Sequence, residues 1–484
     1  MFTQPPTKRR GFYILCKKFA FWRKLLYNIC RQQKHKQIQH VANSTMLKKF
    51  FTSPRSIPIW FLAVILVGSA LLSLPISSVA SPPKYIDALF TSVSAVCVTG
   101  LITVDTATQW SLFGQIVILL LLQIGGMGVV TIAMVFHLIF HQRIGLGQRN
   151  LMQESISAHE LGGIVRFTRF IIVGILTVEL VGAIAMCPIF IADFGWGEGI
   201  WKAIFHSVSA FCNAGFDIMG TTEAKFVSLT RYVANPVINI TVIMLIVAGG
   251  LGFLTWQDIA KNGVHVKRYR TQSKLILVTT AILIVLPAVY FFFADFGNMP
   301  FGQRLLASLF AAVSPRTAGF STTDYNNMSE VGIALTDILM LIGGSPGSTA
   351  GGMKTTTAAL LMLTVASVLR KKEEVSTSAR RFDDFAIKSA ITLLVIYFTT
   401  FFVGGAAISL IENLPLTKCL FEAASALGTV GLTMGITPTL GIASKIILMA
   451  MMFAGRIGAL TLFYAALQPD NGNYRLPQEK ITVG

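Results

Sequence analysis

Four short apolar segments each carry a phenylalanine, a serine and, five or six residues after the serine, a glycine. A cation that sheds its water needs several oxygen ligands at once, and backbone carbonyls supply them without a fixed charge. Glycine lets a strand turn its carbonyls toward an ion, because no Cβ obstructs the required dihedral angles. Four such glycines could therefore contribute to one ring of carbonyls. The segments read LFTSVSAVCVTGL (89–101), IFHSVSAFCNAGF (204–216), LFAAVSPRTAGF (309–320) and LFEAASALGTVGL (420–432).

The residues at the end of each segment are small and include no acidic side chain. This disfavours the rings of carboxylates that serve as calcium or sodium filters. We predict that these strands bind a dehydrated cation; four ordinary turns are the alternative. Cys97 and Cys212 stand at equivalent positions, where packing behind a strand is expected in preference to a disulfide or a metal site. The expected ion-binding residues are Val98, Thr99, Gly100, Asn213, Ala214, Gly215, Thr317, Ala318, Gly319, Thr429, Val430 and Gly431.

A charged or titratable side chain beside these strands needs a separate explanation. Arg316 would repel a cation if it faced the ion path. We expect it to turn away and anchor its strand, with Glu422 as a carboxylate partner. His206 is expected to be a hydrogen-bonded packing residue and not a ligand.

A long apolar stretch, 332–369, is interrupted by the glycine-rich sequence LIGGSPGSTAGGMKTTT (341–357). As one helix it would be about 57 Å long, against roughly 30 Å of hydrocarbon, and its glycines and proline oppose a continuous helix. Non-helical backbone at membrane depth must be buried in protein or line water. We predict a gate here, with a packing kink as the alternative. The expected gating residues are Gly343, Gly344, Gly347, Gly351, Gly352, Lys354 and Arg456, the last two because charges at membrane depth are usually functional.

The composition requires a membrane around these segments. Of the 484 residues, 53% are hydrophobic and 13% are charged, about half the roughly 25% that is usual in soluble proteins. A water-soluble enzyme and a disordered scaffold are therefore excluded. The six cysteines form no CxxC pair, which argues against a zinc site or a redox dithiol. Apolar runs of membrane-spanning length predict eight spans, at 57–79, 111–140, 168–192, 236–259, 274–294, 332–369, 388–411 and 442–467.

The net charge of +18 is concentrated at the start of the chain, where residues 1–55 hold 13 Lys and Arg and no acidic residue. This distribution argues against a nucleic-acid partner. Of the 40 basic residues, 30 lie in this tail, in alternate loops or at the end of the chain, which predicts that both termini are cytoplasmic. The tail could lie on the membrane surface or be a disordered extension.

The four segments recur about every 110 residues, each between two spans, so the units are parallel and not inverted. We predict an all-α integral membrane protein with eight transmembrane helices, arranged as four parallel helix–pore loop–helix repeats around one pseudo-fourfold pore. The expected parts are a basic cytoplasmic tail (1–55), repeat 1 (56–140), repeat 2 (141–262), repeat 3 with an interrupted gating helix (263–370), repeat 4 (371–470) and a cytoplasmic C-terminal segment (471–484).

The four motifs, the glycine-rich interruption, MFAGRIGALT near the end and the closing YRLPQEKITVG resemble the Trk/Ktr/HKT superfamily of potassium transport proteins. The nearest likeness is to the KtrB-type bacterial membrane subunit, and it covers residues 57–484. The resemblance implies potassium uptake across the cell membrane through a channel-like pore, with K+ bound at the filter carbonyls. It also implies that sodium can promote this uptake, and that four filter glycines are typical of the potassium-selective type.

The same resemblance implies a homodimer and a cytoplasmic KtrA/TrkA-like regulatory subunit that binds nucleotide and acts on the interrupted span. This chain has no nucleotide-binding fingerprint of its own, so no cofactor other than the transported K+ is expected on it. A cation-coupled secondary transporter is the alternative function. It would require inverted repeats or acidic residues in the middle of spans, and Glu179 is interpreted as the only such acid. A receptor or structural membrane protein would leave the four glycine strands unexplained.

Overall fold

The computed structural model describes residues 57–79, 81–128, 164–377 and 380–458. Within these ranges the chain is mostly helical, and one small antiparallel hairpin, β1 (Ser376–Thr377) with β2 (Arg380–Arg381), joins two helices. The helices are α2 (Ile57–Leu72), α3 (Tyr85–Val96), α4 (Thr106–Gln109), α5 (Leu112–Met127), α8 (Ile164–Phe194), α9 (Trp196–Phe211), α10 (Pro236–Gly250), α11 (Phe253–Asn262), α12 (Thr271–Ala294), α13 (Phe301–Val313), α14 (Glu330–Leu341), α15 (Thr355–Leu369), α16 (Asp384–Glu412), α17 (Leu416–Gly428) and α18 (Ile442–Ile457).

Three helices, α8, α12 and α16, are long and apolar enough to cross a membrane. The pair α10 and α11 would make a fourth, but these two helices are bent by 101° at their junction. The predicted span 236–259 is therefore wrong as a single helix, because Gly252 adopts a left-handed φ of 86° that ends the helical path. The predicted spans 111–140 and 442–467 both run beyond the described residues.

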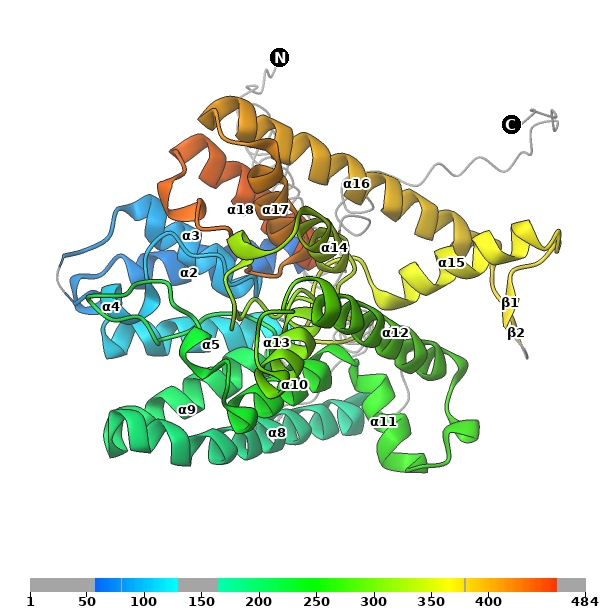
Figure 1. Cartoon of the computed structure of the whole chain (residues 1–484), viewed down its shortest axis with the longest axis horizontal. Helices are drawn as coiled ribbons and strands as arrows, with labels where there is room; N and C mark the ends of the chain where they lie inside the picture. Colours follow the sequence, from blue (N-terminus) through cyan, green and yellow to red (C-terminus); the bar gives the residue numbers. More distant parts are fainter. Residues whose placement is uncertain (1–56, 80, 129–163, 378–379, 459–484) are drawn as a thin grey trace, which may run out of the picture. The chain divides into compact units, whose positions relative to one another are not determined.

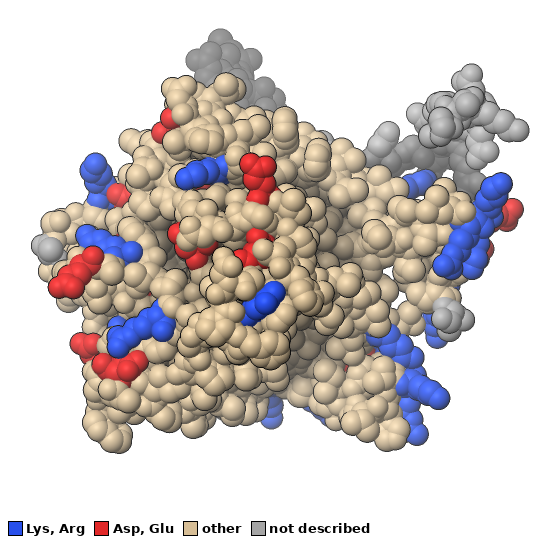
Figure 2. All heavy atoms as spheres, viewed as in Figure 1, with Lys and Arg blue, Asp and Glu red and all other residues tan. Residues whose placement is uncertain are grey.

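Large apolar side chains face outward along these helices. On α8, for example, Val173, Leu176, Leu180, Val181 and Ile184 are each more than half exposed. Such a surface suits lipid, where an apolar exterior costs nothing. Figure 2 shows basic side chains gathered at the end of the molecule where α11, β1 and β2 lie, and uncharged surface over the middle of α12 and α16.

Each of four shorter helices packs along the longer helix that precedes it, giving the pairs α2–α3, α8–α9, α12–α13 and α16–α17 (Figure 1). In three of the four sets, the next helix begins at a residue whose side chain caps it. Ser111 accepts the Gly114 amide at the start of α5, Asn235 accepts those of Val237 and Ile238 in α10, and Ser329 accepts that of Gly332 in α14. The short helices α3, α9, α13 and α17 thus hold fixed places between longer ones.

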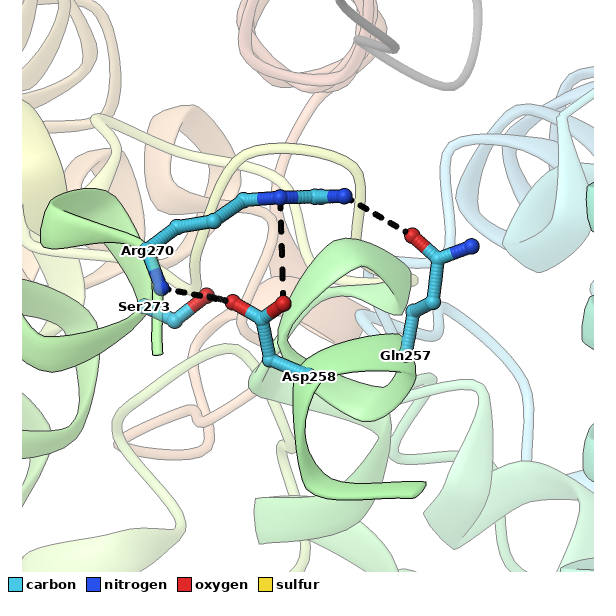
Figure 3. Close-up of polar contacts among 4 residues, drawn as sticks. All are labelled: Gln257, Asp258, Arg270 and Ser273. Atoms are coloured by element: carbon cyan, nitrogen blue, oxygen red, sulfur yellow. Dashed lines mark hydrogen bonds and ion pairs between the residues drawn. The ribbon is translucent and has the colours of Figure 1, made fainter. Parts of the chain in front are cut away.

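A corner between α11 and α12 is fixed by one buried carboxylate (Figure 3). Asp258 Oδ2 accepts hydrogen bonds from the Arg270 amide at 3.1 Å and the Ser273 hydroxyl at 2.7 Å. The Arg270 side chain lies 3.7 Å from the other oxygen of Asp258 and also donates to Gln257. Because Asp258 accepts the free amide at the start of α12, it acts as a cap contributed by a neighbouring helix.

Candidate functional site

The four shared serines attach each short helix to the non-helical strand that follows it. In every case the serine carbonyl accepts a hydrogen bond from the amide of the residue before the motif glycine, at 2.8 or 2.9 Å. The pairs, donor first, are Thr99 and Ser94, Ala214 and Ser209, Ala318 and Ser314, and Val430 and Ser425. The strand therefore turns back across the C-terminal end of its own helix. This explains why the serine recurs at nearly constant spacing from the glycine.

The serine hydroxyls do not all make the same contact. Ser94 and Ser425 each accept the amide of their motif glycine at 3.0 Å. Ser209 instead donates to the Phe216 carbonyl at 2.7 Å, and Ser314 donates to the Phe320 carbonyl, one residue past the glycine. The serine hydroxyl thus binds a backbone amide of the first and fourth strands and a backbone carbonyl of the second and third.

Two residues in each strand adopt left-handed backbone angles. The motif glycines have φ of 90°, 69°, 78° and 97°, and the residues two positions earlier have φ of 56°, 58°, 70° and 53°. Those earlier residues are Val98, Asn213, Thr317 and Thr429. A left-handed valine or threonine is a backbone outlier that costs about 1–3 kcal/mol and is characteristic of functional sites. Sequence reasoning missed this second left-handed position, because glycine is the only residue type in these strands whose presence indicates a left-handed backbone.

The four motif glycines meet in a closed ring. A methyl group added at Gly100 would collide with the Ala214 carbonyl oxygen, and one at Gly215 with that of Ala318. A methyl at Gly319 would meet the Val430 carbonyl, and one at Gly431 the Thr99 carbonyl. The strands therefore follow one another around an axis in chain order. All twelve residues predicted to bind the ion lie in these strands and are buried.

Three threonine hydroxyls in the ring, those of Thr99, Thr317 and Thr429, are buried and have no hydrogen-bond partner among the described residues. Buried hydroxyls are normally paired. Together with carbonyls crowded at one axis, these oxygens are a donor set suited to a cation or to water that accompanies it.

An ion pair that the sequence did not suggest joins α3, the first short helix, to α18. Lys445, in the first turn of α18, lies with its Nζ 2.9 Å from Asp87 Oδ1 on α3, and both side chains are largely buried. No spacing rule could have paired residues 358 positions apart. The contact holds α3 against α18.

A second set of glycines lies just beyond the ring. Gly125, Gly249 and Gly455, on α5, α10 and α18, each pack so closely on the last turn of a short helix that a methyl would strike the carbonyl of Val96, Phe211 or Leu427. The sequences are IGGMG, AGGLG and AGRIG, and IGGSPG begins the interruption after α14. This recurrence was an available signal that the sequence analysis did not use. Arg456 stands where the other three have a second glycine.

The interruption between α14 and α15, residues 342–354, is non-helical as predicted. It packs under the ring: Thr349 donates to the Phe211 carbonyl at 3.1 Å, and Gly351 lies against the Thr429 side chain. It also contacts the break between α10 and α11. There the Ser345 amide donates to the Gly250 carbonyl at 2.9 Å, and the Phe253 amide donates to the Gly347 carbonyl at 2.8 Å. We call residues 342–354 the broken-helix loop.

Two cationic side chains hold carbonyls of the broken-helix loop. Lys354 Nζ donates to the Ala350 carbonyl at 2.8 Å, and Arg456 donates to the Thr349 carbonyl. The same guanidinium donates to the carbonyls of Gly125 and, at 3.2 Å, of Gly126. Arg456 thereby links the loop to the ends of α5 and α18.

A family model described as "TrkH: Cation transport protein" matches residues 33–474. The chain belongs to the TrkH family of cation transport proteins. Two relatives are 37% identical: the potassium/sodium uptake protein NtpJ of Enterococcus hirae over 437 residues, covering 88% of this chain and 95% of that one, and the Ktr system potassium uptake protein B of Bacillus subtilis over 440 residues, covering 90% and 97%. The crystal structure of the potassium transporter TrkH from Vibrio parahaemolyticus shares the fold, with a TM-score of 0.65 at 21% identity and 84% coverage of each chain.

One predicted contact in this TrkH-family chain is wrong. Arg316 does turn away from the ring, but its guanidinium lies 3.5 Å from the Thr280 hydroxyl on α12 and not beside Glu422. Glu422 instead accepts the Met434 amide at 3.1 Å and the hydroxyls of Thr433 and Thr437. Neutral donors from the loop after the fourth strand already satisfy this carboxylate, so it needs no cation.

Glu179 is interpreted as the only acid well inside a span, and a second acid lies near the start of the predicted span 332–369. Asp337 lies in α14, and one of its oxygens has no hydrogen-bond partner among the described residues. Glu179 is buried on α8, where it accepts from Gln123 at 3.1 Å and lies near Cys212. Its contacts place it beside α5 and the end of α9.

The loops beyond the ring are tied by Asp105, which accepts the Thr108 amide at 2.9 Å and the Phe226 amide at 2.8 Å. Asp217 follows the second strand and accepts the Met219 amide. The pKa of Asp217 is raised to about 7, because burial and the nearby Asp105 carboxylate raise it more than the Met219 amide and Lys202 lower it. Acidic side chains in this region are thus engaged with loop amides.

Proposed function

We propose that this chain takes up potassium through a pore whose narrowest part is the ring of four strands. The observation that carries the proposal is the recurrence of left-handed backbone at two positions in each strand, with the four motif glycines meeting in a closed ring. Alternating backbone handedness turns successive carbonyls toward one side of a strand, which is how a filter replaces the hydration shell of an ion. The names of the two relatives, a potassium/sodium and a potassium uptake protein, support potassium as the substrate. We further propose that sodium promotes this uptake.

The architecture that we propose around this filter is four parallel repeats, at 56–140, 141–262, 263–370 and 371–470, with eight membrane crossings. The four helix pairs that each end in a serine-bound strand support it. In this scheme α3, α9, α13 and α17 are pore helices that enter the membrane without crossing it. Their C-terminal ends, which carry partial negative charge, point toward the ring and favour a cation.

We propose that the broken-helix loop gates the pore. It lies directly under the Thr429 side chain and is held by Lys354 and Arg456, so it places backbone and two positive charges beside the ion path. Positive charge there opposes cation entry. A movement that exchanges these contacts would open the path.

We propose that a cytoplasmic nucleotide-binding subunit of the KtrA/TrkA type drives this movement. We also propose that the chain forms a homodimer in the cell membrane and that both of its termini face the cytoplasm. The bend between α10 and α11 supports a route, because its residues contact the loop at Gly347 and Asp258 of the same α11 anchors the start of α12 (Figure 3). The basic side chains near α11 suit the cytoplasmic side.

Cation-coupled secondary transport is the second candidate, and Asp337 is the observation that favours it, since an acid within a span, with one oxygen unpaired among the described residues, could carry a proton. The two functions differ in what drives them. In liposomes, a channel-like pore would pass rubidium down its own gradient without a sodium or proton gradient, and a coupled transporter would not. Rubidium uptake by potassium-uptake-deficient cells, with and without a cytoplasmic regulatory subunit, tests the proposal in a cell.

A further inference from the structure

One position in the pore helices differs between the four repeats in a way that the filter motif does not explain. It directly follows the shared phenylalanine and stands three residues before the shared serine. The residues there are Thr91, His206, Ala311 and Glu422. Two of them are titratable and completely buried.

His206 holds the second strand beyond its glycine. Its Nδ1 lies 2.7 Å from the Lys202 carbonyl, which can only accept, so Nδ1 carries the proton and Nε2 is free to accept. The Ile218 amide donates to Nε2 at 3.4 Å, and Lys202 Nζ donates to the Ile218 carbonyl at 2.6 Å. The third residue past Gly215 is therefore bound through both of its backbone groups.

Glu422 does the same for the fourth strand. The Met434 amide, again the third residue past the motif glycine, donates to Oε1 at 3.1 Å. The hydroxyls of Thr433 and Thr437 donate to the two carboxylate oxygens at 2.5 and 2.6 Å. One structural position thus supplies an acceptor to one equivalent amide, by a histidine nitrogen in one case and a carboxylate oxygen in the other.

Among the described residues, the first and third repeats lack this contact. Ala311 has no polar group, and the Thr91 hydroxyl donates to the Asp87 carbonyl of its own helix. Because the glycines follow one another around the ring in chain order, the second and fourth strands lie opposite each other. Resting on the proposed filter function, we infer that His206 and Glu422 are a pair of positioning residues that fix two opposite strands and thereby set the potassium-over-sodium discrimination of the ring.

The physical reason is that discrimination depends on where the carbonyls stand and how far they can move. A buried amide without an acceptor is a costly state that the strand escapes by shifting. A shift at Ile218 or Met434 is transmitted to the carbonyls of the strand two to four residues earlier. Total flux can survive such a shift, whereas discrimination between two ions cannot.

The test measures sodium competition against rubidium uptake by purified full-length protein in liposomes. His206→Phe removes the acceptor and suits the aromatic surroundings of Phe190 and Phe320, and Glu422→Leu removes the carboxylate. Each should lower discrimination by roughly three- to tenfold, the effect of losing one or two hydrogen bonds. His206→Gln and Glu422→Gln, which keep one acceptor oxygen, should restore most of it.

Thr91→Val is the matched control, since it alters the same position in a repeat without the contact, and it should leave discrimination unchanged. Should the first two variants fail to fold, Lys202→Met removes the hydrogen bond to the Ile218 carbonyl and Thr437→Val removes one donor to Glu422; each loosens the same two strand ends and carries the test. Unchanged discrimination in the folded variants, while Gly100→Ser lowers it, would overturn the positioning role but keep the filter. Unchanged discrimination in Gly100→Ser as well would overturn the filter assignment itself.

Discussion

The ring of strands and the glycines beneath it differ in how far the four segments agree. In the ring, every segment keeps its glycine, its left-handed residue two positions earlier and its serine. Below the ring, three segments have paired glycines, the fourth has Arg456 in place of the second glycine, and the third continues into the broken-helix loop. We interpret this as a division of tasks: ion contact is shared equally by four segments, and control is assigned to two of them at a different depth.

The two levels are also held together differently. In the ring, backbone meets backbone so closely that even a methyl group would collide. The broken-helix loop has backbone contacts with the α10–α11 bend, but its carbonyls at 349–351 are held by the flexible side chains of Lys354 and Arg456. A structure held by backbone contacts resists displacement, whereas long side chains can exchange one carbonyl for another at modest cost. The following changes test this contrast, beginning with the largest expected effect.

Gly431→Ala should abolish most potassium uptake, by about tenfold or more, because the methyl would strike the Thr99 carbonyl and the position has a left-handed φ of 97°. Gly302→Ala is the matched control, since a methyl there meets no atom within 4 Å. Growth of potassium-uptake-deficient cells at low potassium provides the measurement. Equal growth of both variants would show that the ring is not the site of permeation.

Deletion of Gly343–Gly352 should raise rubidium flux when no cytoplasmic partner is present and reduce the response to a nucleotide-bound partner. Gating equilibria usually involve a few kcal/mol, so removal of the obstruction should be plain in liposomes. Protein that elutes as a folded species on size-exclusion chromatography is required for the comparison. A folded deletion variant with parental flux would mean that the loop is a packing kink.

Lys354→Gln should raise flux in the same direction but less, because one charge is lost while the backbone obstruction stays. Arg456→Ala should act more strongly than Lys354→Gln, since its guanidinium binds carbonyls of both α5 and the loop. Flux per folded protein in liposomes measures both. A thermal unfolding scan separates loss of gating from loss of the helix contacts that Arg456 makes, and lower flux in folded Lys354→Gln would contradict its role in closure.

The smallest effects are expected at the shared serines, and they should not be equal. Ser94→Ala leaves the buried Gly100 amide without an acceptor, at a cost of about 1–3 kcal/mol. Ser209→Ala leaves the Phe216 carbonyl without its hydrogen-bond donor, and unpaired carbonyls are better tolerated than unpaired amides. Sodium competition against rubidium should therefore worsen more in Ser94→Ala, and equal losses would contradict the distinction between the two kinds of strand.

Much of the site could be predicted from sequence because the decisive residues are small and repeat. The four glycines, the serines and the interrupted helix are signals in the sequence itself, and the twelve predicted residues do lie together. The predictions failed where contacts depend on three-dimensional placement. Nothing in the sequence pairs Lys445 with Asp87, and nothing says that Glu422 is satisfied by threonine hydroxyls and not by Arg316. The bend after Gly250 was missed because hydropathy does not register a change of direction.

The central claim is that the four strands select potassium, and Gly100→Ser tests it most directly. A side chain at Gly100 would crowd the Ala214 carbonyl and reduce the coordination available to the larger ion. Rubidium uptake into liposomes is measured against increasing sodium for the parent protein and for this variant, each normalised to folded protein. The account predicts that sodium competes poorly in the parent and much better in Gly100→Ser. Identical competition curves for the two proteins would contradict it.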